Sequence, residues 1–147
     1  MLALKLVRLI EANSQELAQG LMQKVLSSDR TNDYRKVPAA EMHTATTDIY
    51  QHLSDWLLTK TASDIELRYT QIGEARARQG VSLSHFVWAL ALTKEHLWGF
   101  LQREALVDRV VELFGELELL RLLDQFFDNA LYYGTVGYER AHKAKAA

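Results

Sequence analysis

The chain lacks cysteine altogether, and it has one proline and seven glycines among its 147 residues. Without cysteine there is no disulfide, no thiolate nucleophile and no thiolate metal site, and the composition suits a reducing compartment. So little proline and glycine leaves few of the turns that a multi-stranded sheet needs, and no Asn-Gly or Asp-Gly hairpin signal occurs. We therefore expect an all-α fold.

A strong excess of one charge and a long apolar run are also lacking. The formal net charge is -2, which predicts no general attraction to nucleic acid or to anionic lipid. The apolar run over residues 2–10 is interrupted by Lys5 and Arg8 and shows no small-residue cleavage pattern, so it is read neither as a signal peptide nor as a membrane span. We expect a cytoplasmic protein that binds no nucleic acid and no membrane.

Apolar residues are abundant, at 48% of the chain, and their spacing predicts five to six helices in a single domain over residues 1–147. Pro38 suits the first turn of a helix, Ser63 a helix N-cap, Gly80 the residue after a helix and Ser82 the next N-cap. The last predicted helix is long and follows a weakly defined segment around residues 107–114. The expected helices cover about residues 4–26, 38–56, 63–80, 83–104 and 116–142.

The helix expected over residues 83–104 is apolar nearly all round, which predicts burial on two sides. Its primary face carries Leu83, Phe86, Val87, Leu90, Leu97, Trp98 and Leu101. A second face carries His85, Trp88, Leu92 and His96. A central place in the bundle explains both faces; alternatively, Trp88, His85 and His96 line a small-molecule pocket or a subunit contact.

The last predicted helix carries two adjoining apolar stripes. The first has the a/d spacing of a coiled-coil seam and is our candidate dimer interface: Leu119, Leu123, Phe126, Ala130, Tyr133 and Gly137. The second stripe consists of Leu120, Phe127, Leu131, Gly134, Tyr138 and Ala141. One stripe can pack on its own domain while the other meets a second copy, with Gly134 and Gly137 allowing close backbone approach. A broad core-facing surface inside a monomer is the simpler interpretation.

Several segments together carry a resemblance to a known family. They are LVRLIEANSQELAQGLMQKVL, RTNDYRKV with its Tyr34, the helix pair over residues 76–101, and LLDQFFDNALYYGTVGYERAH. These resemble the N-terminal sensory domain of RsbR/RsbRD-type stressosome co-antagonists and related histidine-kinase input domains.

The resemblance implies a globin-like helical fold without haem, a homodimer, and signal transfer through the last helix into a regulatory or kinase output domain. It supplies no ligand residues. The resembling proteins continue into an output domain, whereas this chain ends at AHKAKAA. The tail over residues 142–147 is therefore expected to lead to an output that is absent or separate.

Haem and a di-iron site are the two metal centres that histidines on helices could hold. Haem needs an axial histidine, and the candidates are His43, His52, His85, His96 and His142; His96 is the first to test because Trp88 and Leu92 lie near it. A di-iron bundle needs repeated Glu-x-x-His motifs, and only Glu139 with His142 provides one. Asp48 and His52 are read as a solvated contact between neighbouring turns.

The segment RQGVSLSHF resembles the start of a DNA-recognition helix, but the apolar residues 86–92 that follow cannot face base edges. Neither a phosphate-binding loop nor a catalytic triad pattern is present. We therefore predict a non-catalytic signalling domain without a cofactor, which dimerises and transmits a conformational signal through its last helix. The alternative is a haem- or small-ligand-binding sensor of the same fold.

Overall fold

The computed structural model describes residues 2–59, 61–104 and 110–146, and within these the side chains outside residues 2–5, 58, 110–116 and 145–146. The described residues contain helices and no strand, so the predicted all-α class is confirmed. The elements in chain order are α1 (Leu2–Ala12), α2 (Ser14–Ser27), the 3-10 helix η1 (Asp29–Lys36), α3 (Ala39–Gln51), the π-helical turn η2 (Asp55–Thr59), α4 (Ala62–Arg78), α5 (Leu83–Glu104) and α6 (Val110–Ala146).

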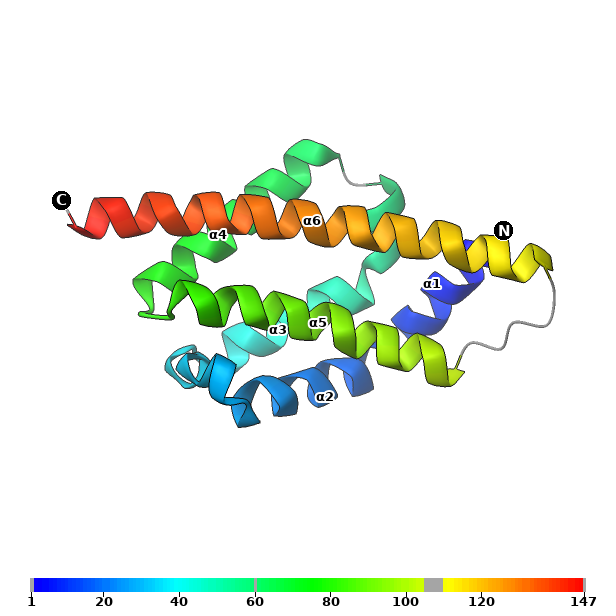
Figure 1. Ribbon diagram of the computed structural model, residues 1–147, viewed down its shortest axis with the longest axis horizontal. Helices are drawn as coiled ribbons and strands as arrows, with labels where there is room; N and C mark the ends of the chain where they lie inside the picture. Colours follow the sequence, from blue (N-terminus) through cyan, green and yellow to red (C-terminus); the bar gives the residue numbers. More distant parts are fainter. Residues whose placement is uncertain (1, 60, 105–109, 147) are drawn as a thin grey trace.

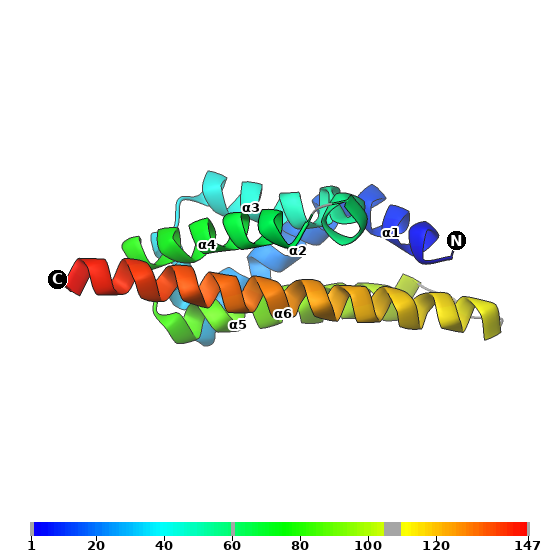
Figure 2. The same cartoon turned by 90° about the horizontal axis from the view of Figure 1, so that it is seen from above.

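The long C-terminal helix organises the molecule. α6 has 37 residues, which corresponds to about 55 Å at the rise of an α-helix. In Figure 1 it runs along the whole molecule beside α5, while α4 crosses behind it. Seen from above in Figure 2, α3 and α4 lie on one side, α5 and α6 on the other, and α1 lies near the N-terminal half of α6. The C-terminal end of α6 projects past the turn that joins α4 to α5 (Figure 1).

The turn between α4 and α5 has the predicted glycine stop. Gly80 has a φ of 81°, a conformation that residues with a Cβ rarely adopt. The Val81 N–H donates to the Arg76 carbonyl, and the Gly80 N–H donates to the Ala77 carbonyl. This is the Schellman pattern, and it satisfies carbonyl groups that the end of α4 would otherwise leave free.

Three helix boundaries differ from the sequence-based expectation. The first helix is broken at Asn13, whose side-chain amide donates to the Leu9 carbonyl. α4 is capped by Thr61 and not by Ser63, because Thr61 and Asp64 form a capping box in which each side chain binds the other residue's backbone N–H. The second predicted helix ends at Gln51, and the chain reaches Trp56 only after a further break.

The start of the last helix also differs. The segment expected to be weakly defined, 107–114, lies partly outside the described residues, and from Val110 onward it is already helical. Pro38 sits at the N-cap of α3, one position before the expected first turn.

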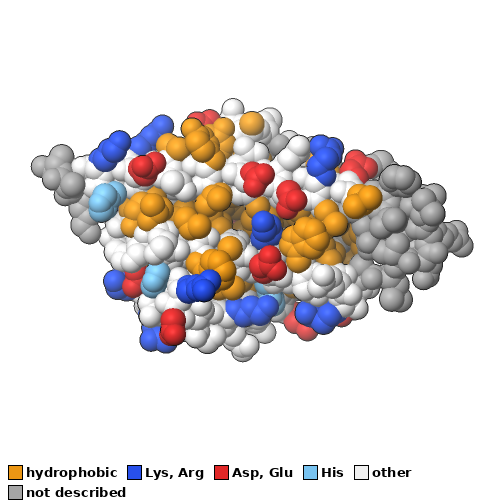
Figure 3. Space-filling model, viewed as in Figure 1, with side chains coloured by type: hydrophobic (Ala, Val, Ile, Leu, Met, Phe, Trp, Pro, Cys, Tyr) orange, Lys and Arg blue, Asp and Glu red, His pale blue; other side chains and the backbone are white. Residues whose placement is uncertain are grey.

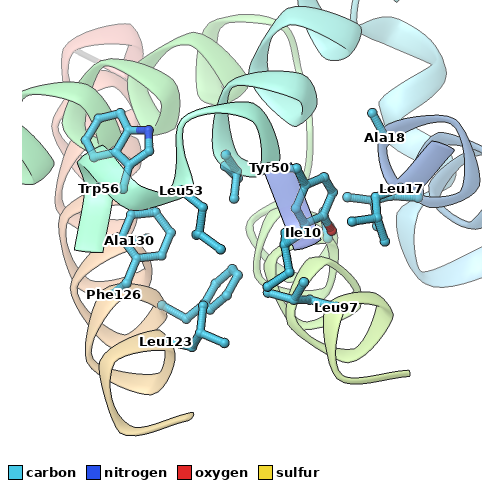
Figure 4. Packing of buried hydrophobic residues seen from close by; sticks show 14 of the residues in the cluster. Ile10, Leu17, Ala18, Tyr50, Leu53, Trp56, Leu97, Leu123, Phe126 and Ala130 are labelled. Carbon is cyan, nitrogen blue, oxygen red and sulfur yellow. The ribbon is translucent and has the colours of Figure 1, made fainter. Parts of the chain in front are cut away.

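The buried apolar side chains form one cluster that includes residues from all six α-helices. Figure 4 shows its centre, where Ile10 of α1 and Tyr50 of α3 meet Leu97 of α5, and where Phe126 of α6 lies near Trp56. Tyr50 is wholly buried, and its hydroxyl donates to the Thr93 carbonyl at 3.1 Å. Because this polar group is satisfied, its burial is not penalised.

Candidate functional site

The first apolar stripe of α6 faces the core of its own chain. Leu119, Leu123, Phe126 and Ala130 are at most 3% exposed. The centre of the Phe126 ring lies 5.9 Å from that of the Trp56 ring and 5.6 Å from that of the Tyr69 ring, so η2 and α4 cover it. Gly137 is buried and Tyr133 half-buried. These side chains are used in folding one chain, and their burial there does not favour the predicted dimer seam on this stripe.

Close approach at the glycines is confirmed, but the partner is α4. A Cβ on Gly73 of α4 would lie 1.9 Å from the Gly134 carbonyl oxygen, and one on Gly137 would lie 2.1 Å from the Thr70 carbonyl oxygen. Both distances are far below van der Waals contact, so the two backbones touch where side chains would hold them apart. α4 and α6 therefore pack backbone against backbone at these glycines.

The second stripe of α6 lies toward α5. A Cβ on Gly134 would come within 2.6 Å of the Phe86 ring, and the Tyr138 ring stacks on Phe86 at 6.2 Å. The Tyr138 hydroxyl donates to the Val81 carbonyl at 2.6 Å. In Figure 3 a band of apolar side chains runs along α6 and between α6 and α5 on the exposed face. The two helices therefore form one continuous surface.

Large apolar side chains remain exposed on α6. Of the five most exposed ones among the described residues, three belong to this helix: Leu117 at 51%, Leu131 at 37% and Tyr132 at 64%. We call these three residues the outer patch. Farther along, the described side chains His142, Lys143 and Ala144 are exposed on the end of the helix that projects from the domain.

The three candidate ligand residues of α5 do not converge on one pocket. The guanidinium of Arg30 lies 4.5 Å above the Trp88 ring, and His85 Nδ1 accepts a hydrogen bond from the Asp33 N–H at 3.2 Å. Both contacts come from η1, so these residues hold that segment onto the start of α5.

Asp33 completes this junction between η1 and α5. Its carboxylate accepts hydrogen bonds from the Ser82 hydroxyl and the Ser82 N–H. The hydrogen bond from the Ser82 hydroxyl, followed by that from its N–H, lowers the pKa of Asp33 to about 2, with further contributions from His85 and Lys36. Ser82 occupies the N-cap position of α5 as predicted, since its carbonyl accepts the Phe86 N–H, but its side chain is bound to Asp33.

His96 lies apart from these residues, between α5 and α2. It is 8% exposed. Its ring is so close to Gly20 that a Cβ there would lie 2.9 Å from it. Burial lowers the pKa of His96, and the positive charges of Lys24 and Arg103 lower it further. His96 is thus a neutral packing residue that requires a glycine opposite it.

A cavity of about 70 Å³ lies between α2, α3, α4 and α5. Its walls are mostly apolar, and among the described residues of the lining Arg76 alone is charged. A shallower hollow of about 410 Å³ opens between α3 and α4, and Ala45, Ile72 and Arg76 line both spaces. Arg76 therefore stands between the surface and the interior.

The remaining metal and membrane candidates gain no support from the geometry. No group of three or more potential metal ligands occurs among the described residues. Asp48 pairs with Arg68 at 3.8 Å, and His52, Glu139 and His142 are exposed. None of the described helices combines the length and hydropathy of a membrane crossing. Neither the cavity nor the hollow has a histidine in its lining, so the haem alternative is not favoured.

Comparison with known proteins decides the family. The family described as the RsbT co-antagonist protein rsbRD N-terminal domain matches residues 15–147. The chain belongs to this family. The match covers α2 to the end of α6 and confirms the resemblance that the sequence carries. Neither a curated protein nor a solved structure matches the chain significantly.

RsbRD N-terminal domains are regulatory domains of stress signalling, and the family acts with partners in stressosome complexes. What sequence reasoning missed in this RsbRD-type domain is Gly73, which decides how α4 meets α6, and Arg76, which was not predicted to be buried. Arg76 follows Ile65, Tyr69 and Ile72 at helical spacing, and that register is the signal that could have predicted its burial.

Proposed function

We propose that this RsbRD N-terminal domain is a sensory module that homodimerises through the outer patch of α6 and transmits a conformational signal along that helix. The observation that carries the proposal is the dual role of α6. The helix forms one wall of the core, exposes Leu117, Leu131 and Tyr132 on its other side, and continues beyond the domain.

Physical considerations support a second copy as the occupant of the outer patch. Three large apolar side chains on one helix are costly to leave in water, and a symmetric pair covers the same surface on both chains at once. Figure 3 shows further apolar side chains along α6 and between α6 and α5, which would enlarge the area that a partner buries. We also propose that the domain is non-catalytic and cytoplasmic and that its helices have a globin-like topology.

Signal transfer follows from the tight packing between α4 and α6. Because their backbones touch at Gly73, Gly134 and Gly137, a shift of α4 cannot be absorbed by side-chain rotation there. α6 must move with α4, and packed helices move between discrete arrangements. A change inside the domain then reaches the projecting end of α6 and any regulatory or kinase output joined or docked to it.

A fusion to a dimeric reporter kinase tests this proposal. The domain is joined through Ala141, and one to four alanines are inserted at the junction, each of which rotates the output by about 100°. Reporter activity that oscillates with insertion length supports transmission through a continuous helix. Insertions of equal length made of glycine and serine are the control, because they interrupt the helix and should abolish the oscillation. Activity that is indifferent to both series would leave only a passive scaffold.

A further inference from the structure

The cavity between α2, α3, α4 and α5 has the chemistry of a binding site for a small anion with an apolar tail. Its apolar walls are made by side chains from all four helices, among them Leu21, Met42, Ile72 and Phe86. The one charged group in this lining is Arg76, and its carboxylate partner, Glu41, is not part of it. The described lining therefore supplies no carboxylate of its own to the cation, whose ion pair with Glu41 lies outside it.

Arg76 has unused hydrogen-bonding capacity. Its side chain is only 4% exposed, and Nη1 donates to Glu41 Oε1 and to Gln79 Oε1, each at 3.0 Å. Its Nε–H is buried and has no partner among the described residues. A buried donor on a cation that lacks an acceptor is costly. A carboxylate is the acceptor whose geometry a guanidinium matches best.

A second polar group of the lining points to the same chemistry. Tyr34 is buried beside Arg76, whose guanidinium lies 5.8 Å from the centre of the Tyr34 ring. Burial raises the pKa of Tyr34 to about 12 even though Arg76 opposes the shift, so the phenol keeps its proton. The hydroxyls of Thr46 and Thr93 already donate to carbonyls of their own helices. Arg76 Nε is thus the donor that remains to bind a ligand, beside the protonated Tyr34 hydroxyl, which is already hydrogen-bonded to Arg76.

We propose that this cavity binds a short-chain aliphatic monocarboxylate, with the carboxylate at Arg76 Nε and the hydrocarbon tail between the apolar walls. The size sets the class, because about 70 Å³ is less than half of the ~150 Å³ cavity that accommodates benzene. The expected entry is the hollow between α3 and α4, because it shares Ala45, Ile72 and Arg76 with the cavity lining. The inference deepens the sensory role proposed above, but its test measures binding alone.

Two residues of the cavity wall also touch α6. The Tyr69 ring lies 5.6 Å from that of Phe126, and Phe86 stacks on Tyr138 and lies against Gly134. A ligand that fills the cavity presses on both side chains. Binding would therefore favour one arrangement of α6 over another, as ligand-driven switching requires.

Titration of the purified domain with butyrate labelled with carbon-13 in its carboxylate, followed by NMR, tests the proposal. We expect saturable binding with a Kd on the order of 1 mM or tighter. 1-Butanol, which has the same tail and no charge, should bind at least about tenfold more weakly. Arg76→Met should abolish this preference, Arg76→Lys should retain part of it, and Arg68→Gln should leave it unchanged, because Arg68 lines surface hollows and not the cavity.

Ala45→Leu keeps Arg76 and fills part of the cavity, because Ala45 belongs to the cavity lining, so this variant tests the proposal even if Arg76→Met does not fold. It should weaken butyrate binding by at least about tenfold. Equal binding of butyrate and butanol, unchanged butyrate binding in Ala45→Leu, or no saturable binding of butyrate to the unmodified domain would overturn the proposal. None of these results bears on the dimer or on the insertion series, so failure of the ligand and failure of the signalling helix are distinguishable.

Discussion

The two sides of α6 differ in burial: the inner side is packed in the core and the outer side is exposed. On the inner side, tilted and edge-to-face aromatic contacts around Phe126 and backbone contact at Gly73 and Gly134 leave no space for added atoms. On the outer side, Leu117, Leu131 and Tyr132 are exposed along a face that also carries charged residues. The difference teaches that one helix can be essential to the fold and still offer a surface that can be altered without unfolding the domain.

We expect the largest loss of stability from a charge placed on the inner side of α6. Phe126→Glu removes a large buried ring and places a carboxylate among Trp56 and Tyr69, so we expect a loss of about 4 kcal/mol or more in the free energy of unfolding. Circular dichroism in urea measures this. A Phe126→Glu protein that is as stable as the unmodified one and merely monomeric would show that the inner stripe meets a partner after all.

Adding a methyl group at the glycine contact is the next most damaging change. Gly73→Ala puts a Cβ 1.9 Å from the Gly134 carbonyl oxygen, so α4 and α6 must separate, at a cost of about 1–3 kcal/mol. Gly99→Ala on α5 is the matched control, because the nearest atom to its Cβ is the end of a flexible arginine at 3.4 Å. That variant should gain up to about 1 kcal/mol from helix propensity. If thermal unfolding shows the same effect for both glycines, the contact is not tight.

Charges on the outer side should act on association and not on folding. The double variant Leu131→Glu with Tyr132→Glu alters two exposed side chains, so we expect the stability of each chain to change by about 0.5 kcal/mol or less. The same variant should convert the dimer into a monomer at micromolar concentration, as measured by light scattering. A dimer that persists with both glutamates present would exclude the outer patch as its seam.

The smallest expected effect concerns the junction of η1 with α5. Because the folded state lowers the pKa of Asp33 from 3.8 to about 2, its contribution to stability is complete above the unfolded value and is lost as the pH falls between these two values. Asp33→Asn should therefore be less stable than the unmodified chain at pH 6, and the difference should shrink toward pH 2. Asp29→Asn, an exposed change in the same segment, is the control. A difference that stays constant with pH would mean that Asp33 acts without its charge.

Much of the fold could be predicted because the chain marks some of its own boundaries. Pro38 allows few backbone conformations, Gly80 adopts one that other residues rarely do, and both helix ends lie within a residue or so of the predicted place. The break at Asn13 was not predicted, because the apolar spacing of the first helix continues across it. Thr61 was passed over for Ser63, although Asp64 three residues later completes the capping box.

The site was harder to predict, since α6 carries two apolar stripes that look equivalent in sequence. Which one faces inward is decided by residues far away in the chain, namely Gly73, Tyr69 and Phe86. Periodicity describes one helix at a time and holds no information on its neighbours. The cavity around Arg76 could not be predicted for the same reason, because its walls come from four helices.

The absence of cysteine from the chain permits one decisive measurement of the central claim that the outer side of α6 meets a second copy. Leu131→Cys and, separately, Leu67→Cys place a single thiol on an exposed apolar position of α6 or of α4, at 37% and 62% exposure. Under mild oxidation, the account predicts a disulfide-linked dimer from Leu131→Cys at protein concentrations where Leu67→Cys remains monomeric. Equal cross-linking of both variants, or preferential cross-linking of Leu67→Cys, would contradict it.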